Sequence, residues 1–242
     1  MFARRMSGGH SNTSMLAGAV VVALLSVSCR EATPARAPET PKPELFLLTA
    51  LPLVWSEDFG LDQPGSPALK ALEQVYRVTA IDLPSQLPDG ALLLAAQPRA
   101  LPAEELVELD SWVRAGGRLL LLADPMLEWK SNIPLGDTRR PPMAFADTGL
   151  LERWGLRLDA PEERGARDGA VSERSVLTAS PGALVATGDG CNVRDAGLTA
   201  RCRLGKGEAI IIADADFLNV GSDKRGEQNL AVLASQLASL TR

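Results

Sequence analysis

The chain has 242 residues, of which 45% are apolar, so it is long and apolar enough to fold around one ordinary hydrophobic core. Its formal net charge is −5, and residues 30–242 carry 30 acidic and 23 basic side chains, which argues against nucleic acid as a partner because phosphate binding needs a basic face. The only histidine, His10, lies ahead of an apolar segment, so the rest of the chain cannot form a Ser-His-Asp triad or a histidine-ligated zinc site.

Residues 1–29 have the pattern of an export segment. Arg4 and Arg5 precede the apolar residues 15–29, which are fewer than the roughly 20 that span a bilayer comfortably. Small residues precede Cys29, which resembles the lipidation site of a bacterial lipoprotein and would become the first residue after cleavage. An uncleaved anchor and ordinary export are the alternatives. All three predict a domain outside the cytoplasm, at the periplasmic face of a bacterial cell envelope.

Residues 30–43 read as a tether. The segment contains four prolines and no aromatic residue. Such a composition cannot form a packed core, so it predicts a disordered link between the membrane and a folded domain over residues 44–242.

The folded domain begins with alternating strand and helix patterns. In chain order they predict a strand over 44–55 that runs into a loop at Pro52, a helix over 66–78 with Ser66 as its N-cap, a short strand over 78–83, and a buried strand over 90–97.

Residues 102–125 are the most informative stretch. Leu106, Leu109 and Trp112 recur at helical spacing, and two glycines then end the helix. The apolar run 119–122 that follows suits a parallel strand buried on both faces. We therefore expect an α/β fold with a mostly parallel, Rossmann-like sheet and helices on both faces, whose ligands bind beyond the carboxyl ends of the strands.

Residues 126–147 break this pattern and predict a long irregular loop over the end of the preceding strand. The remaining patterns predict a helix and then a strand within 147–158, a polar loop over 159–174, antiparallel strands over 175–187 and 191–202, a strand over 207–219, and a terminal helix over 226–240.

Cys191 and Cys202 are equidistant from Ala196-Gly197. A two-residue turn there would place the cysteines opposite each other on an antiparallel hairpin, close enough for a disulfide. The alternative is two separate thiols. Gly205-Lys206-Gly207 predicts a hairpin turn rather than a phosphate loop, because a strand and not a helix follows it.

Two strands end in carboxylates, in the motifs LLLLADP and AIIIADADFLN. If these strands are parallel neighbours, Asp124, Asp214 and Asp216 gather at one rim, with Asn219 close behind. There the carboxylates would bind a cation or an amine, or divide acid and base roles. Alternatively, each acid caps backbone N–H groups of the turn that follows it, which is the interpretation we favour.

Trp55 and Trp129 fall in loops after strands, where they would line a pocket, and the alternative is packing over the edge of the sheet. Trp154 lies in a predicted helix and is expected in the core. No dinucleotide-binding or nucleophile-elbow motif is present, and a hard cation would need about six oxygen ligands, so we expect no catalytic residue, no cofactor and no resident metal.

Three blocks, ELDSWVRAGGRLLLLADPMLE, LLERWGLRLD and GEAIIIADADFLN, resemble the extracytoplasmic domain of GldG-type ABC-transporter auxiliary proteins over roughly residues 44–240. The resemblance implies the flavodoxin-like fold of the class I glutamine amidotransferase-like superfamily, working beside an ABC transporter without catalysis. The amidotransferase nucleophile would be a cysteine on a sharp turn after a strand. Here the corresponding strand end reads Ala123-Asp124-Pro125 and no histidine follows.

The leading hypothesis is a non-catalytic, membrane-tethered domain that binds a ligand or partner for an ABC transport system, with a permease or another envelope protein as partner. The alternative is a carboxylate-dependent periplasmic hydrolase using Asp124, Asp214 or Asp216, possible without histidine because inverting glycosidases need only two carboxylates about 6.5–9.5 Å apart. A third hypothesis is a structural module, whose mark would be a large exposed apolar patch.

Overall fold

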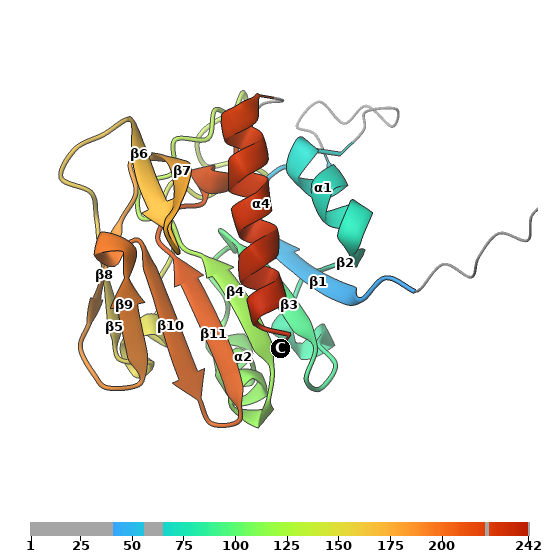
Figure 1. The fold of residues 1–242 in the computed structure, drawn as a ribbon. Helices are drawn as coiled ribbons and strands as arrows, with labels where there is room; N and C mark the ends of the chain where they lie inside the picture. The colour runs from blue at the N-terminus through green and yellow to red at the C-terminus, as the bar shows by residue number, and fades with distance from the viewer. Residues whose placement is uncertain (1–40, 56–64, 221–222, 242) are drawn as a thin grey trace, which may run out of the picture. The chain divides into compact units, whose positions relative to one another are not determined.

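A sheet of seven strands forms the centre of the domain (Figure 1). The computed structural model describes residues 41–55, 65–220 and 223–241, so the predicted export segment, Cys29 and most of the predicted tether lie outside the described residues. In spatial order the strands are β2 (Arg77–Ile81), β1 (Glu44–Thr49), β3 (Leu92–Ala96), β4 (Arg118–Leu122), β11 (Gly207–Ile212), β10 (Thr199–Leu204) and β9 (Cys191–Arg194).

The first five of these strands run parallel, and β10 and β9 run antiparallel at one edge. From β1 the chain moves outward to β2, crosses back over β1 to β3, and continues through β4 toward β11. This reversal places the topological switch point between β1 and β3, as in a flavodoxin-like sheet. The predicted α/β class, with a mostly parallel sheet and an antiparallel hairpin in its C-terminal part, is therefore confirmed.

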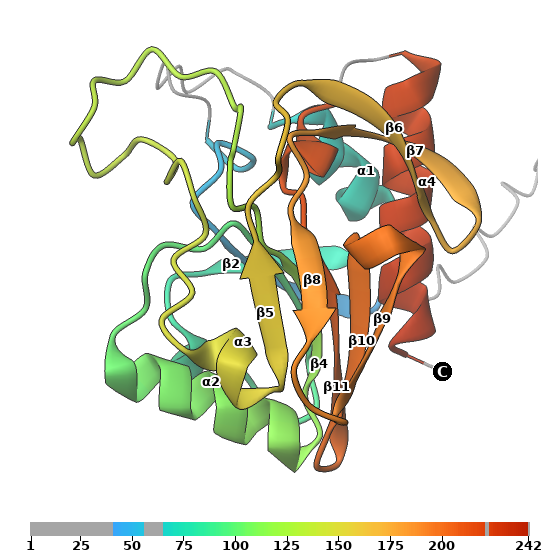
Figure 2. The same ribbon diagram turned by 90° about the vertical axis from the view of Figure 1, so that its left-hand side faces the viewer.

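Helices cover both faces of the sheet, as predicted. Figure 2 shows one pair on each side: α1 (Pro67–Val75) with α4 (Lys224–Ser239), and α2 (Ala103–Ala115) with α3 (Leu150–Arg153). Within the described part of the chain, none of the helices is long and apolar enough to cross a membrane.

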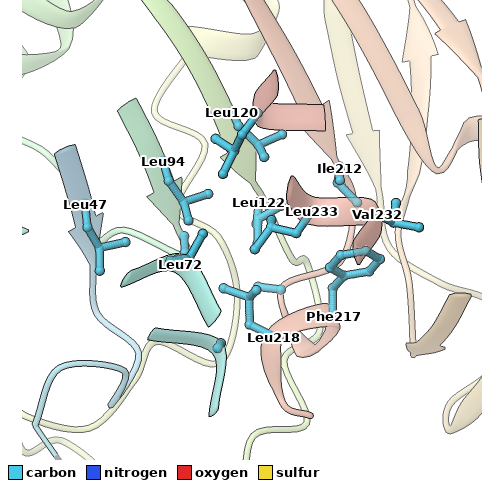
Figure 3. Packing of buried hydrophobic residues seen from close by; sticks show 14 of the residues in the cluster. Leu47, Leu72, Leu94, Leu120, Leu122, Ile212, Phe217, Leu218, Val232 and Leu233 are labelled. Carbon is cyan, nitrogen blue, oxygen red and sulfur yellow. The ribbon is translucent and has the colours of Figure 1, made fainter. Parts of the chain in front are cut away.

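Two hydrophobic clusters, one on each face, hold these layers together. On one face, Leu47, Leu94 and Leu122 of three strands meet Leu72 of α1 and Leu233 of α4 (Figure 3). The alternate residues of the same strands belong to the second cluster, which includes α2 and α3. Each fully buried leucine contributes about 1.5–3 kcal/mol of apolar burial, and burial on both faces explains why these strands are unbroken apolar runs.

Local signals determine where the helices begin and end. The Ser66 side chain accepts a hydrogen bond from a first-turn N–H of α1, as an N-cap does, and Pro67 occupies the first helical position. After α2, Gly116 has a φ of +131°, which favours glycine. A Cβ at Gly117 would lie 2.5 Å from the ring of Trp112, so this second glycine lets the indole cross the backbone.

The predicted cysteine hairpin is formed by β9 and β10. Cys191 and Cys202 are directly paired in register, their Cα atoms lie 4.0 Å apart, and a disulfide joins them. The pairing is therefore confirmed. The turn is longer than predicted, because residues 195–198 all connect the strands, but it stays centred on Ala196-Gly197 and so preserves the register.

The prediction of a polar loop over 159–174 is wrong. Two further antiparallel pairs occupy this region and the residues after it: β5 (Leu156–Asp159) with β8 (Ala183–Ala186), and β6 (Ala166–Val171) with β7 (Arg174–Ala179). The pattern missed β6 because only Val171 of its six residues is buried. Its hairpin turn, Ser172-Glu173, has positive φ at both residues, as a type I′ turn requires.

Three other predicted elements are shorter in the structure. β1 ends at Thr49 and does not continue to residue 55. α3 has a single turn because Gly149 and Gly155, on either side of it, have φ values of +97° and +79°. The strand predicted over 207–219 ends with β11, and a short 3₁₀ turn, Asp216–Leu218, follows it.

Residues 126–147 form the predicted irregular loop, which extends from the end of the sheet (Figure 2). Two backbone hydrogen bonds close its neck: Phe145 N donates to Asp124 O at 2.6 Å, and Leu127 N donates to Met143 O at 2.9 Å. The long segment is therefore a closed surface loop rather than an open excursion.

Candidate functional site

The predicted carboxylates do gather at the carboxyl ends of two neighbouring strands. β4 and β11 are parallel, and Leu122 pairs with Ile212, so Asp124 and Asp214 each lie two residues beyond this last pair. The 3₁₀ turn that follows β11 brings Asp216 to the same edge, where its N–H faces the Asp124 carboxylate at 3.4 Å. The three acids therefore meet at one rim, as the strand endings predicted.

Asp124 is completely buried, and backbone groups occupy its carboxylate. Its Oδ2 accepts from the N–H groups of Ala215 and Asp216, and its Oδ1 accepts from Met126 N at 2.8 Å. Burial raises the pKa of Asp124, and these hydrogen bonds oppose the rise. The side chain fastens the turn after β11 to the end of β4, which is the capping role favoured above.

Asp214 has a similar environment. It is also completely buried, with Oδ1 accepting from Phe217 N at 2.6 Å and Oδ2 accepting from Ala179 N at 2.9 Å. Burial, with repulsion from Asp124, raises the pKa of Asp214 well above its usual value. This carboxyl therefore connects β7 to the turn after β11, and we assign it a structural role.

Asp216 differs from its two neighbours. Its Oδ2 accepts from Glu128 N at 2.6 Å, but its Oδ1 is buried and accepts no hydrogen bond of ordinary geometry. The pKa of Asp216 is raised to about 6, mainly by burial and also by repulsion from Asp124. Hydrogen bonds from the Glu128 N–H and the Asn219 side chain oppose this rise. An unsatisfied buried carboxylate oxygen usually marks the place of a water, an ion or a ligand.

A hollow of about 350 Å³ opens beside Asp216, and we call it the Asp216 hollow. It lies between the neck of the 126–147 loop, the β6–β7 hairpin, the turn after β11 and the first turn of α4. Its lining comprises Glu128, Ala166, Leu177, Thr178, Ala179, Asp216, Asn219, Val220, Asp223, Gly226 and Asn229. Two of the predicted site residues, Asp216 and Asn219, are therefore brought together here.

Trp55 lines a different hollow, of about 450 Å³, at the ends of β1 and β2. Thr49 of its lining ends β1 and Arg99 follows β3, so this hollow lies at the topological switch point, where doubly wound folds bind ligands. Ile133 and Arg139 of the 126–147 loop complete one wall. We call it the switch-point hollow.

Sequence reasoning missed Thr49 and Arg99 at the switch point. Thr49 lies within the strand predicted over 44–55, and Arg99 lies shortly after the strand predicted over 90–97. Many residues lie near predicted strand ends, and only the strand order shows which two endings flank the reversal. Trp129 is half-buried against the core cluster and lines neither hollow, so it packs over the sheet, which was its alternative interpretation. Trp154 is buried, as predicted.

The sharp turn that an amidotransferase nucleophile would occupy was predicted after β4, at Asp124, but the residue with a left-handed backbone follows β3 instead. Gln97, directly after β3, has a φ of +44° and is completely buried, whereas Asp124 is not in the left-handed region. The Gln97 carboxamide donates to Asp124 O at 3.0 Å and accepts from Asp124 N at 2.9 Å. A carboxamide used in this way joins β3 to β4 and is not a nucleophile. Among the described residues, no group of three or more His, Cys, Asp or Glu side chains is arranged to hold a metal ion.

Several solved structures resemble this chain, and a family model matches part of it. A search of curated proteins found no match. Among solved structures, an exo-β-1,4-mannosidase from Opitutaceae bacterium strain TAV5 has a TM-score of 0.51 at 16% identity, covering 81% of this chain and 36% of that one. A β-galactosidase from Rahnella sp. R3 has a TM-score of 0.48 at 13% identity, covering 84% and 32%. Cytoplasmic protein STM3548 from Salmonella typhimurium has a TM-score of 0.45 at 11% identity, and the match covers 82% of this chain and 98% of that one.

The chain spans only about a third of the length of the first two structures, and at this identity the mannosidase likeness shows the fold alone. The family comparison goes further, because the model described as "ABC-type uncharacterized transport system" matches residues 42–172, more than half of the chain. The chain therefore belongs to the auxiliary family of ABC-type transport systems.

Proposed function

We propose that this auxiliary component is a non-catalytic domain that the N-terminal segment tethers at the periplasmic face of a bacterial membrane, where it binds a partner and a ligand of its transport system. Family membership supports the link to transport. The basic, apolar and proline-rich order of residues 1–43 supports export and tethering.

The observation that carries partner binding is the exposed apolar surface of the 126–147 loop. Leu135 and Met143 are 73% and 60% exposed, and Trp55, at 72%, lines the switch-point hollow together with Ile133 of this loop. Large apolar side chains exposed on an irregular loop are a feature of many protein-binding surfaces. We propose that this surface docks on a permease of the transport system.

The alternative of a carboxylate-dependent hydrolase has less support. An inverting glycosidase needs two carboxyl groups that both reach substrate and water. Asp124 and Asp214 have no exposed surface, and backbone N–H groups occupy both oxygens of each. Of these three acids, Asp216 alone lines a hollow and keeps an oxygen without a donor, so the three do not provide the required pair.

Cross-linking in the native host tests the partner. We expect the wild-type chain to yield a cross-link to a permease subunit, and the double variant Leu135→Asp/Met143→Asp to lose most of it because charge replaces apolar contact. Val107→Asp is the matched control, since Val107 is 66% exposed on α2, on another part of the surface. Recovery of no membrane partner with the wild type, or equal yields from all variants, would overturn the proposal.

Lipid labelling and membrane fractionation test the tether. We expect Cys29→Ser to abolish incorporation of a labelled fatty acid and to release the chain from the membrane fraction. A membrane-bound variant with an unshortened N-terminus would identify an uncleaved anchor instead. A wild-type chain that is unlabelled and released would identify ordinary export and remove tethering from the proposal.

A further inference from the structure

One buried carboxylate oxygen beside the Asp216 hollow has no hydrogen-bond donor of ordinary geometry. Asp216 is 7% exposed, and its Oδ1 has no hydrogen-bond partner although it is shielded from solvent. A buried oxygen of this kind destabilises the fold unless a donor reaches it. The other two acids of the rim do not share this state, because backbone N–H groups occupy their oxygens.

The charges around this oxygen are of one sign. Glu128 and Asp223 add two more carboxyl groups to the lining, and the described residues that line the hollow include no lysine or arginine. The first turn of α4 does not supply the missing donor, because Asp223 accepts from Gly226 N at 2.8 Å and so caps that helix itself. At neutral pH Asp216 is mostly ionised, since its pKa is about 6. The hollow therefore favours a cationic donor.

The size and composition of the hollow indicate what kind of cation fits. A volume of about 350 Å³ holds a small organic molecule, and Leu177 and Val220 give its walls apolar surface beside the acids. An ammonium group has three N–H donors. Among the residues that line the hollow, the carboxyl groups of Asp216 and Glu128 are acceptors for such donors.

We propose that the Asp216 hollow binds the protonated primary amine of a small ligand or of a lysine side chain. The inference rests on the proposed ligand-binding role and names its chemistry. It is independent of the docking surface, so a failed permease cross-link would not bear on it. Conversely, a hollow without amine affinity would leave the docking proposal intact.

Saturation-transfer NMR on the purified full chain tests the proposal with butylammonium as the probe and n-butanol as its uncharged counterpart. We expect saturation transfer to butylammonium only. Asp216→Asn should weaken its binding about ten- to a hundredfold, because it removes the charge that the ammonium pairs with. Glu108→Gln, an equal loss of charge on the exposed surface of α2, should leave binding unchanged.

Asn219→Lys provides a second test that leaves the buried carboxyl intact. Asn219 is exposed, so the new side chain can reach the hollow without disturbing the core, and its own ammonium should block butylammonium. A peptide, acetyl-Gly-Lys-Gly-amide, distinguishes the two sources of the amine, a lysine side chain and a small free ligand. Tighter binding than butylammonium would identify a lysine of a partner, and weaker binding would identify a free amine.

Three results would overturn the proposal. The first is no transfer to butylammonium at millimolar concentration, which would leave only water beside Asp216. The second is equal binding of butylammonium and butanol, or equal binding to the wild type and to Asp216→Asn. The third is displacement of butylammonium by equimolar calcium chloride, which would make the hollow a metal site.

Discussion

Four of the described aspartates, Asp110, Asp124, Asp214 and Asp216, are buried, and their hydrogen-bond donors decide what each does. Asp124 and Asp214 accept only backbone N–H groups and so shape the turns after β4 and β11. Asp110 accepts side-chain donors, and Asp216 keeps one oxygen without a donor. Depending on its neighbours, an aspartate in this domain therefore stabilises a turn, forms ion pairs or is a candidate for binding a ligand.

Asp110 is the centre of the contact between α2 and α3. Its carboxylate accepts from Arg114 Nε at 2.9 Å, Arg153 Nε at 2.6 Å and the Trp154 indole at 2.8 Å. We expect Asp110→Asn to lower the free energy of unfolding by about 1–3 kcal/mol at pH 7, because it leaves these donors poorly paired in a buried place. Denaturant unfolding measures the change, and Asp159→Asn, which breaks an exposed pair with Arg157, should change stability far less.

The same variant has a defined dependence on pH. Burial raises the pKa of Asp110, but hydrogen bonds from Arg114, Trp154 and Arg153 outweigh it and hold the pKa below 3.8. A lowered pKa contributes stability above the unfolded value and loses it as the pH falls through the folded value. The stability difference between the wild type and Asp110→Asn should therefore shrink below pH 4, and a constant difference would contradict this assignment.

Asp216 should show the opposite sign. Its pKa rises from 3.8 to about 6, so its ionisation destabilises the folded chain as the pH passes from 4 to 6. Relative to the wild type, Asp216→Asn should gain about 3 kcal/mol of unfolding free energy between pH 4 and pH 7, as a shift of this size implies. Unfolding curves of both proteins at the two pH values measure it. Parallel pH profiles would show that Asp216 titrates normally.

At the scale of elements, the edges of the sheet are protected differently. β2 ends one side, and β9 ends the other, where the Cys191–Cys202 disulfide fastens it to β10. β9 has only four residues and lies in no apolar run, so its pairing depends on this bond more than on burial. Short edge strands of this kind limit unwanted pairing between sheets.

Reduction of this disulfide should loosen β9 first. We expect the double variant Cys191→Ala/Cys202→Ala to be less stable by about 2–3 kcal/mol, the usual effect of opening a short disulfide loop, and to exchange the amides of β9 faster. Hydrogen exchange and thermal unfolding, with and without reductant, measure the effect. The wild type should respond to reductant and the double variant should not. Equal stability of both would show that backbone pairing alone holds this edge.

Among the described residues, the two hydrophobic clusters extend from Leu45 and Phe46 of β1 to the C-terminal helix and the antiparallel strands. Residues 41–242 form one compact unit. We therefore predict that this unit folds without the first 40 residues.

A chain that starts at Pro41 should fold by itself. We expect its melting temperature to stay within about 2 °C of the full chain's, a shift that corresponds to about 0.5–1 kcal/mol for a domain of this size. Thermal unfolding followed by circular dichroism measures it. A chain with one core residue removed, Leu94→Ala, gives the scale of a real loss, about 2–5 kcal/mol. A similar loss on truncation would show that the first 40 residues support the core.

Local order along the chain was readable from the sequence because neighbouring residues determine it. The double-sided apolar runs, the Ser66 cap, the Gly116-Gly117 stop and the symmetric cysteines all act within a few residues, and each predicted its element. β6 could not be found in this way, because backbone pairing and a left-handed turn hold it and it buries a single side chain. The capping of Asp124 and Asp214 followed from their positions after strands.

Repeated short-range patterns encode the α/β class, the burial of the sheet on both faces, the cysteine pairing and the place of the long loop, so these could be predicted before the chain was seen folded. Three features became visible only in the folded chain: which strand ends meet at the switch point, the separate hollows of Trp55 and Asp216, and the oxygen of Asp216 that, unlike those of Asp124 and Asp214, has no donor. These depend on contacts between residues up to about ninety positions apart, such as Asp124 with Ala215 and Glu128 with Asp216. Spacing along the chain does not encode such contacts.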